Sequence, residues 1–403
     1  MPNSLAKRWK NSQHDAGGVP AFQNPRIVVK RGPIPYSENH MLPPEEKKFL
    51  HALATAGAEY DAMQKLRAAF ASHEAAWRAG EAELRAAGIG EELAAAVGRA
   101  RSALNPNEEM RKLAREGIAL VTAGEPGYPQ DLAEIAVPPH WLYIKGRVEP
   151  GKPRLAVVGT RKATAYGREA GRKIVRDLAD QADIAIVSGL AQGIDAEAHR
   201  AAIEAGLPTI GVLGGGMDRQ SFFPHENWRL AEEMIEKGGA VISEYPPGTP
   251  ALPHHFLIRN RIIAGLSLGV LVVEAPQRSG ALNTVRYALE QGRDIFAVPG
   301  QMFSPNAVGV HRLIQDGAKL VTNASDILDE LSVPRRTPEA KAETALTDEA
   351  AKTILALLAE PASVDDIKVK TNLPTPEIVT CLSVLELKGF IRPMGQNRFQ
   401  RIV

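Results

Sequence analysis

Glycines, small polar residues and arginines follow several short apolar segments of this chain, and together they suit the binding of an anion. The segments Gly159-Thr160-Arg161, Ser188-Gly189 and Gly214-Gly215-Gly216 each come directly after such a segment. Glycine lets a backbone N–H group approach a phosphate closely, and a helix that begins just beyond adds the positive end of its dipole. One such turn is more often glycine-rich for steric reasons, but their repetition predicts a phosphate site.

Arginine and phenylalanine side chains in the same connections extend the predicted site. Arg161, Arg259 and Arg261 carry planar guanidinium groups that match phosphate oxygens, whereas Arg278 is expected to be a solvated surface residue. Phe256 offers an aromatic face on which an unpaired base can stack. Ordinary core packing explains a lone Phe on an amphipathic helix equally well, so both roles stay open.

A second anion-binding turn is predicted near residue 280. Ser279-Gly280 precedes a helical stretch, and Asn283 and Thr284 fall in its first turn. Backbone N–H groups that lack a helical partner and small polar side chains therefore meet at this helix start.

Two pairs of titratable residues are expected to be structural. Asp195 and His199 share a helix face, which would suit acid–base chemistry, but the simpler interpretation is that Asp195 tightens the turn after Gly193 and His199 packs against it. His254 and His255 are adjacent, so their side chains diverge, and no nearby Cys or paired His supplies metal-ligand spacing. We predict no catalytic residue, no metal and no cofactor.

The elements that position these residues alternate between short strands and amphipathic helices from residue 154 to about residue 331. This alternation is typical of an α/β fold with a Rossmann-like, doubly wound, mostly parallel sheet. In such a sheet, ligands bind beyond the carboxyl ends of the strands, where the candidate residues fall. The predicted strands are 155–158, 184–187, 209–213, 240–243, 270–273 and 295–298, with added strands at 118–121 and 141–144.

The rest of the chain divides around this sheet. Residues 1–40 are polar and rich in proline, and we expect a disordered or extended tail. Residues 41–112 are predicted to form a bundle of short helices. The Gly88-Ile89-Gly90 turn in this bundle could bind a phosphate, as in a helix-hairpin-helix, or could only join two helices. We favour the second interpretation. We expect residues 113–331 to form the extended Rossmann domain and residues 332–345 to form a linker. Residues 346–403 are predicted to form a winged helix, because their pattern indicates three helices followed by a β-hairpin.

Composition restricts where and how the chain works. The formal net charge of +1 disfavours a whole basic face that wraps a duplex, so any nucleic-acid site must be local. The single cysteine, Cys381, rules out an internal disulfide and indicates a reducing compartment. No apolar run is long enough for a signal peptide or a bilayer span, so we expect a cytoplasmic protein that does not bind membranes.

Five ordered motifs closely resemble the DNA-processing protein A family, DprA or Smf. The resemblance covers the Rossmann region fully, and extends more weakly to the N-terminal helices, which look like a sterile-alpha-motif (SAM) domain, and to the winged helix. The motifs are VGTR at 158–161, SGLAQGIDAEAH at 188–199, FLIRNRIIA at 256–264, EAPQRSGALNT at 274–284 and FAVPG at 296–300.

The resemblance implies a non-enzymatic homodimer that binds and protects incoming single-stranded DNA and helps to load the recombinase RecA during natural transformation in competent cells. It assigns DNA contacts to Arg161, Phe256 and Arg259. The predicted DNA site also includes Gln192 and Gly193 of the second motif and Asn260 of the third. The chain departs from the family at three positions. Gln192 stands where Lys or Arg is frequent, Phe223 where Tyr is usual, and Asn283 where an apolar residue is common.

Three other functions fit the sequence less well. A phosphoribohydrolase of the lysine-decarboxylase-like group needs a PGGxGT-type loop followed by a helix carboxylate, but Ser279 to Thr284 is followed here by Val285, Arg286 and Tyr287. A dinucleotide-dependent oxidoreductase is a weaker alternative, because the residues that follow Gly159 do not have the GxGxxG spacing that a pyrophosphate-binding turn needs. A duplex-binding transcription factor is disfavoured, because acidic and basic residues balance in the winged helix, and a partner-binding module fits better.

Overall fold

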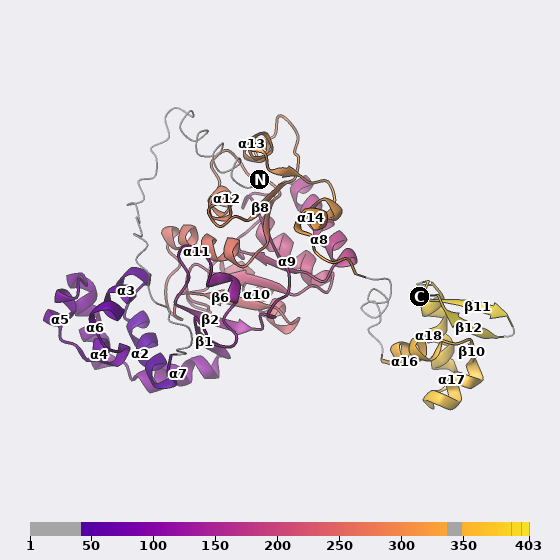
Figure 1. Cartoon of the computed structure of the whole chain (residues 1–403), viewed down its shortest axis with the longest axis horizontal. Helices are drawn as coiled ribbons and strands as arrows, with labels where there is room; N and C mark the ends of the chain where they lie inside the picture. Colours follow the sequence, from indigo (N-terminus) through magenta and orange to yellow (C-terminus); the bar gives the residue numbers. More distant parts are fainter. Residues whose placement is uncertain (1–41, 337–348, 388, 396, 403) are drawn as a thin grey trace. The chain divides into compact units, whose positions relative to one another are not determined.

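The computed structural model describes residues 42–336, 349–387, 389–395 and 397–402. The predicted tail of residues 1–40 and residues 337–345 of the predicted linker lie outside them. The chain forms two compact units, one of which holds the N-terminal helices and the large sheet, and the other the C-terminal winged helix (Figure 1). None of the helices in the described residues combines the length and the apolar character that a bilayer crossing requires.

Short helices build the first part of the larger unit, as the sequence predicts. Pro44 occupies the first turn of the opening helix, where its missing N–H costs no hydrogen bond, and Leu53, Met63 and Leu84 are fully buried between the helices. Gly88 adopts a positive φ of 82° in the turn between two of them, and its carbonyl oxygen accepts a hydrogen bond from Lys65. The helices are α2 (Pro44–Thr55), α3 (Tyr60–Ala69), α4 (His73–Arg78), α5 (Glu81–Ala86), α6 (Glu91–Ala103) and α7 (Pro106–Arg115).

A mixed sheet forms the centre of this unit, in the order β1-β2-β6-β5-β4-β3-β7-β8-β9. β1, β2 and β6 pair antiparallel, and all pairs from β6 to β9 are parallel. The strands are β1 (Ile118–Thr122), β2 (Trp141–Gly146), β3 (Arg154–Val158), β4 (Ala185–Ser188), β5 (Thr209–Val212), β6 (Ala240–Ser243), β7 (Gly269–Val272), β8 (Asp294–Ala297) and β9 (Lys319–Leu320). The doubly wound fold is confirmed, with β9 as a short strand that the sequence pattern does not predict.

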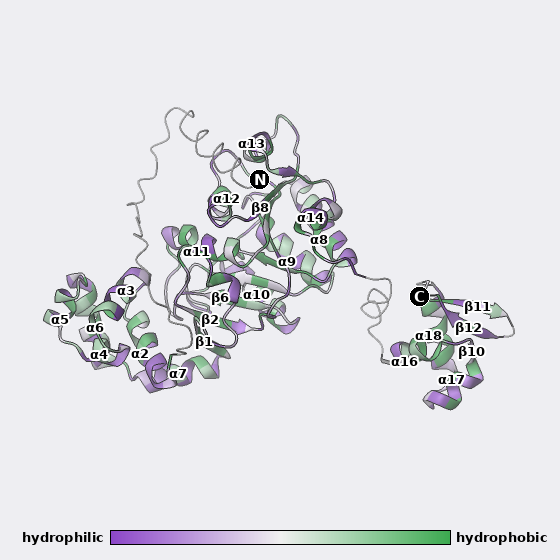
Figure 2. Ribbon diagram, viewed as in Figure 1, coloured by the Kyte–Doolittle hydropathy of each residue, from purple (hydrophilic) through white to green (hydrophobic). Residues whose placement is uncertain are grey.

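Helices cover both faces of the sheet, which explains why its strands are continuous apolar runs (Figure 2). Successive residues of β2 point to opposite sides, so Tyr143 packs in the core shared with the N-terminal helices, whereas Leu142 and Ile144 belong to the core of the other face, which includes residues of α11. The helices are α8 (Ala165–Gln181), α9 (Ile194–Glu204), α10 (Trp228–Glu236), α11 (Pro253–Gly265), α12 (Gly280–Glu290), α13 (Val308–Asp316) and α14 (Ala324–Leu331).

The strand order reverses between β3 and β7, and this position defines where a ligand fits. From β3 the chain proceeds through β4, β5 and β6 in one direction, and from β7 through β8 and β9 in the other. The connections that leave β3 and β7 therefore diverge to opposite sides and leave a crevice between the two strand ends.

The smaller unit is a winged helix, as the sequence predicts. Ser363 and Asp366 form a capping box that starts its second helix, and Ile354, Ile367 and Leu385 are fully buried in its core. Its elements are α16 (Glu349–Leu357), β10 (Ala362–Ser363), α17 (Val364–Thr371), α18 (Thr375–Leu387), β11 (Ile391–Gly395) and β12 (Arg398–Arg401), and the strand order is β10-β12-β11.

Candidate nucleic-acid interface

A cavity of about 530 Å³ opens at the crevice between β3 and β7. The loop after β3, the first two turns of α11 and the turn that starts α12 supply most of its lining. The predicted residues that line it are Gly159, Thr160, Arg161, Phe256, Arg259, Asn260, Ser279, Gly280 and Thr284, and they are joined by Asp195, Phe223 and Arg278.

Two guanidinium groups approach the ring of Phe256. The Cζ atom of Arg161 lies 5.3 Å from the ring centroid and that of Arg259 lies 5.9 Å from it, within the range of cation–π attraction. The ring of Phe223 lies 5.8 Å away at a tilt of 53°. Arg161 is exposed and Phe256 is half-buried, so an aromatic surface with positive charge beside it faces the cavity.

Arg259 is held as a buried cation at the base of this cluster. Its residue is 4% exposed, and Nη1 donates a hydrogen bond of 2.9 Å to the carbonyl oxygen of Gly189. Burial lowers the pKa of Arg259 to about 10, against the opposing attraction of Asp195. Its Nε atom is buried and has no hydrogen-bond partner among the described residues. A buried N–H donor without a partner costs free energy, so the packing around this side chain must compensate for it.

The glycines of the strand-end turns are required mainly by contacts within the protein. A Cβ atom on Gly189 would lie 2.7 Å from Nη2 of Arg259, and one on Gly193, where φ is +75°, would lie 2.3 Å from the carbonyl oxygen of Thr160. Gly280 differs, because a Cβ atom there would have nothing within 4 Å, and because this residue faces the cavity. The predicted close approach of backbone to phosphate therefore fits Gly280 better than the other glycines.

The start of α12 supplies the second anion-binding turn that the sequence predicts. Ser279 is the N-cap residue, and its hydroxyl oxygen accepts a hydrogen bond of 3.3 Å from the N–H of Ala281. Asn260 donates a hydrogen bond of 3.3 Å to the carbonyl oxygen of Gly280, which ties α11 to this turn. Arg278 is exposed, as expected, but it lies on the rim of the cavity.

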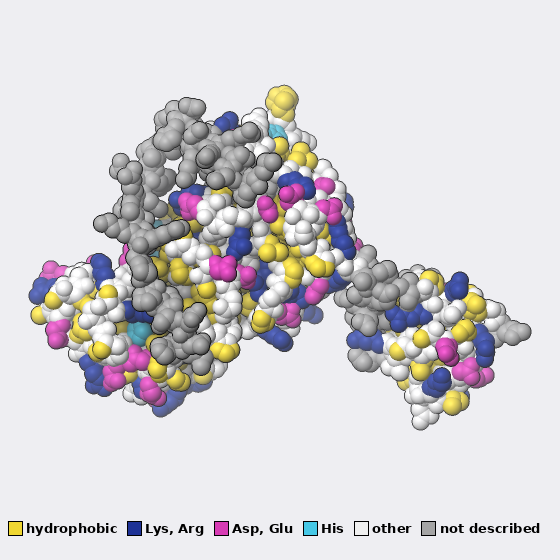
Figure 3. Space-filling view, viewed as in Figure 1, with side chains coloured by type: hydrophobic (Ala, Val, Ile, Leu, Met, Phe, Trp, Pro, Cys, Tyr) yellow, Lys and Arg dark blue, Asp and Glu magenta, His cyan; other side chains and the backbone are white. Residues whose placement is uncertain are grey.

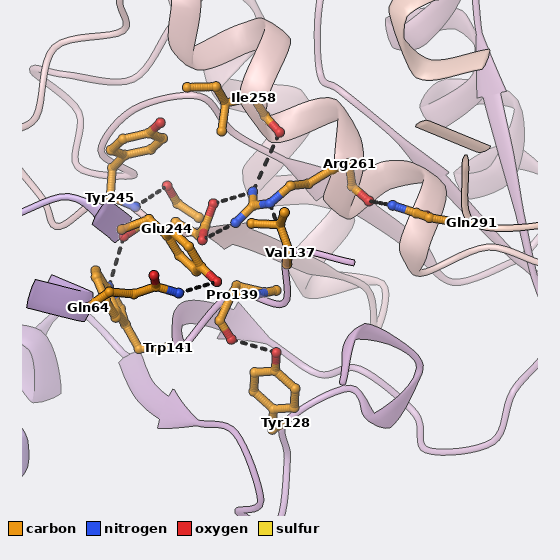
Figure 4. Close-up of polar contacts among 12 residues, drawn as sticks. Gln64, Tyr128, Val137, Pro139, Trp141, Glu244, Tyr245, Ile258, Arg261 and Gln291 are labelled. Atoms are coloured by element: carbon orange, nitrogen blue, oxygen red, sulfur yellow. Dashed lines mark hydrogen bonds and ion pairs between the residues drawn. The ribbon is translucent and has the colours of Figure 1, made fainter. Parts of the chain in front are cut away.

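Arg261 does not reach the cavity, which corrects its predicted role as a phosphate ligand. It is 3% exposed, both terminal nitrogens donate to the carboxylate of Glu244, and Nε donates to the carbonyl oxygen of Val137 at 3.0 Å (Figure 4). Residues two apart on a helix point to nearly opposite sides, so Arg259 and Arg261 cannot share one rim. Arg261 stabilises the fold around Glu244 instead.

Three further predicted contacts are engaged elsewhere. Gln192 is exposed and its amide donates to the carboxylate of Glu226. Asn283 donates a hydrogen bond of 2.8 Å to the carbonyl oxygen of Leu257 and so links α12 to α11. Ser188 is fully buried, and its hydroxyl donates to the carbonyl oxygen of Val157 at 2.6 Å. None of these three side chains lines the cavity.

Asp195 and His199 are structural, but not in the predicted way. Asp195 accepts a hydrogen bond of 3.1 Å from the N–H of Gly189, so it fixes the turn before Gly193 rather than the one after it. Burial raises the pKa of Asp195, with the charge of Arg259 acting against the shift. His199 Nδ1 lies 2.7 Å from the hydroxyl of Thr209 instead of packing on Asp195, and burial lowers its pKa to about 3, which keeps the ring neutral.

Phe223 is an aromatic cavity residue that was not among the predicted DNA contacts. It is 45% exposed and reaches the cavity from the loop between β5 and α10, a long way from Phe256 in the chain. The sequence showed an aromatic residue before Pro224 at a position where the family usually has Tyr, and neither feature by itself indicates a ligand contact.

Comparisons with known proteins agree with this fold. The family model of DNA recombination-mediator protein A matches residues 119–332, and that of the DprA winged helix domain matches residues 337–397. Protein Smf of Escherichia coli (strain K12) is 41% identical over 293 residues, which cover 70% of this chain and 78% of that protein. DNA processing protein DprA of Streptococcus pneumoniae is 47% identical over 204 residues, 50% of this chain and 71% of that protein.

A solved structure shows the same arrangement. The X-ray structure of DNA processing protein A from Streptococcus pneumoniae matches with a TM-score of 0.58 and 35% identity, and the match covers 70% of this chain and 97% of that one. The chain therefore belongs to the DNA recombination-mediator protein A family.

Proposed function

We propose that the chain binds single-stranded DNA in the cavity between β3 and β7 and acts as a recombination mediator without catalysing a reaction. The observation that carries the proposal is the cluster in which Arg161 and Arg259 flank the half-buried ring of Phe256. An aromatic face binds a base of any sequence by stacking, while adjacent guanidinium groups hold the phosphates on either side of it.

The same cluster favours an unpaired strand over a duplex. Bases in a duplex are stacked on one another and cannot reach Phe256 unless the strand is opened, which costs free energy. On the face shown in Figure 3, Lys and Arg side chains are interspersed with Asp and Glu rather than gathered into a continuous basic surface. With a net charge of +1, the protein has little long-range attraction for duplex DNA, so local contacts decide the preference.

The cellular role follows from family membership rather than from the cavity. We propose that the chain acts in the cytoplasm as a homodimer, protects incoming single strands and helps to load RecA during natural transformation. In this scheme residues 113–331 bind DNA, residues 41–112 form a SAM-like support, and the winged helix of residues 346–403, reached through the linker 332–345, contacts a partner protein. A RecA strand-exchange assay with and without the protein, and its mass in solution by light scattering, test these points.

A nucleotide-hydrolysing Rossmann enzyme is the rival. Asp195 is the carboxylate among the residues that line the cavity, and it is occupied by the turn at Gly189 and by the charge of Arg259. This arrangement suits a structural group better than an acid–base catalyst, which must be free to exchange a proton with the substrate.

One titration separates the two functions. Labelled single-stranded oligonucleotide, the matching duplex and a nucleoside monophosphate are each titrated with protein over a range of salt concentrations, and the monophosphate is also assayed for release of its base. The proposal expects single strands to bind tightest, with an affinity that falls as salt rises, and no released base. Tight binding of the monophosphate with hydrolysis would establish the enzyme instead.

A further inference from the structure

Three potential metal ligands meet where the N-terminal helices contact α11. Glu59 is the N-cap residue of α3, and His254 and His255 lie in the first turn of α11. One ligand atom from each lies within 4.8 Å of the others, and His255 Nε2 is 3.1 Å from Oε1 of Glu59. The sequence predicted no metal, because only residues close to the two histidines in the chain were considered. Glu59 could not be included, since it is 196 residues away from His255.

His255 is already fixed in position. Its side chain is 1% exposed, and its ring stacks on that of Tyr245 with centroids 4.1 Å apart and an interplanar angle of 22°. Its Nδ1 atom is buried without a hydrogen-bond partner among the described residues, so the contact with Glu59 is the polar contact that orients the ring.

We propose that Glu59, His254 and His255 bind a zinc ion that links the N-terminal helices to α11. Two imidazoles and one carboxylate are a ligand set that Zn²⁺ favours, with bonds of about 2.0–2.2 Å in a tetrahedron. Such bonds place neighbouring ligand atoms roughly 3.3 Å apart, and the spacing between Glu59 and His255 is 3.1 Å. His254 and Glu59 are exposed, so the ion can enter from solvent and keep a water as its fourth ligand.

Some of the charges around the site oppose the binding of a cation, and others favour it. The positive end of the α11 dipole opposes a cation, and the carboxylate of Glu59 offsets it. Glu244, which Arg261 neutralises, is next to Tyr245 in the chain and adds no free negative charge. Coordination by the two imidazoles must therefore supply most of the selectivity, which favours transition metals over Mg²⁺ and Ca²⁺.

Zinc at this site would also steady the DNA cavity. Pro253 and Phe256, on either side of the two histidines, line the cavity. An ion that fixes the first turn of α11 would hold the ring of Phe256 in its stacking position before DNA arrives, and so remove an ordering cost from binding. This consequence rests on the proposed function, whereas the metal site itself does not.

Calorimetric titration of untagged, chelator-treated full-length protein with zinc chloride tests the site. We expect one zinc per chain, and Glu59→Gln and His254→Ala should each weaken it by at least the ~10–100-fold that loss of a supporting group usually costs. His225→Ala, at an exposed histidine of the short 3-10 helix His225–Asn227, is the matched control and should bind as the parent does. Cobalt in place of zinc should give the visible absorption of a four-coordinate site in the parent only. Equal zinc binding by parent and both variants, with their melting temperatures unchanged, would overturn the proposal.

A second measurement separates the site from its effect on DNA. Single-strand affinity of the parent is compared with and without zinc, and again for His254→Ala. The proposal expects zinc to strengthen binding in the parent and to leave the variant unchanged. If zinc binds but does not change the affinity for single-stranded DNA, the proposed effect on the DNA cavity is refuted, while the metal site itself still stands. Zinc binding by a protein that binds no single strand at all would retain the site and refute the proposed function.

Discussion

The guanidinium group of Arg161 lies over the ring of Phe256, with its Cζ atom 5.3 Å from the ring centroid. Arg161 is exposed, whereas the ring is half-buried in the cavity wall. The arginine can therefore rotate toward a phosphate without moving the ring. This pair divides the binding of a single strand between a mobile charge and a stacking surface.

Removal of the mobile charge should affect affinity and salt dependence together. Arg161→Ala is expected to weaken single-strand binding and to lower the slope of log affinity against log salt by about one phosphate contact. Filter binding at several salt concentrations measures both quantities. Arg176→Ala, at an exposed arginine of α8 paired loosely with Glu169, is the control and should leave the slope unchanged. An unaltered slope in Arg161→Ala would remove this residue from the site.

Removal of the stacking surface should affect affinity without changing the salt slope. Phe256→Ala is expected to cost about 1–3 kcal/mol of single-strand binding free energy, and Phe256→Tyr, which keeps the ring, much less. Thermal melting of the same proteins decides between the two roles that the sequence leaves open. A lowered melting temperature with intact DNA binding would show that Phe256 is a core residue.

The turn that contacts Arg259 should not tolerate a methyl group at Gly189. In Gly189→Ala the new Cβ would lie 2.7 Å both from Nη2 of Arg259 and from Oδ2 of Asp195, so the buried arginine has to move. We expect a loss of stability of about 1–3 kcal/mol, typical of overpacking, together with weaker DNA binding. Gly171→Ala, inside α8, is the control, since the nearest atom to that Cβ position, Cγ2 of Val273, lies at an ordinary contact distance of 3.6 Å. Equal denaturant midpoints for the two variants would contradict the packing described for Arg259.

Arg261 should behave as a residue of the fold. Its removal leaves the carboxylate of Glu244, whose side chain is only 11% exposed, without its partner, so Arg261→Ala is expected to cost about 3–5 kcal/mol of unfolding free energy. Urea denaturation measures this loss. At temperatures where the variant is folded, the salt slope of DNA binding should equal that of the parent. A reduced slope with normal stability would return Arg261 to the predicted phosphate site.

Buried neutral histidines should make the protein sensitive to acid. Burial lowers the pKa of His51 to about 4 and the pKa values of His140 and His199 to about 3. Below about pH 6.5 the unfolded chain takes up protons at these positions and the folded chain does not. The unfolding free energy should therefore fall as pH decreases from 6.5 toward 4, by at most about 1.4 kcal/mol per pH unit for each histidine.

One substitution tests this dependence. His199→Asn removes a titrating group that contacts Thr209, so its unfolding free energy should be lower near neutral pH but should fall less steeply in acid. His225→Asn, at an exposed position, should follow the parent curve. Parallel curves for parent and His199→Asn would show that His199 takes up its proton equally in both states.

Most of the fold could be predicted because its strands are buried on both faces. Such strands must be short, continuous apolar runs, and the runs ending near Val158, Val187 and Val212 mark three of them within one or two residues. β9 could not be predicted, because a two-residue strand with Leu320 44% exposed leaves no pattern.

The site was predictable only where the fold brings its residues together at one edge. Arg161 and Arg259 meet because strand ends and α11 converge there. Arg261 was placed wrongly, since proximity in sequence was taken for proximity on a helix surface. Phe223 and Glu59 come from distant segments, and only tertiary packing sets them beside Phe256 and His255.

The most direct measurement is a photocrosslink from the DNA itself. An oligonucleotide that carries 5-iodouracil is irradiated in complex with the full-length protein, and the attached residue is identified by mass spectrometry. A base stacked in the cavity should crosslink to Phe256, with Phe223 as the adjacent ring, and the crosslink should disappear in Phe256→Ala. Crosslinks confined to the winged helix or to the N-terminal helices, with none at the cavity, would contradict the account.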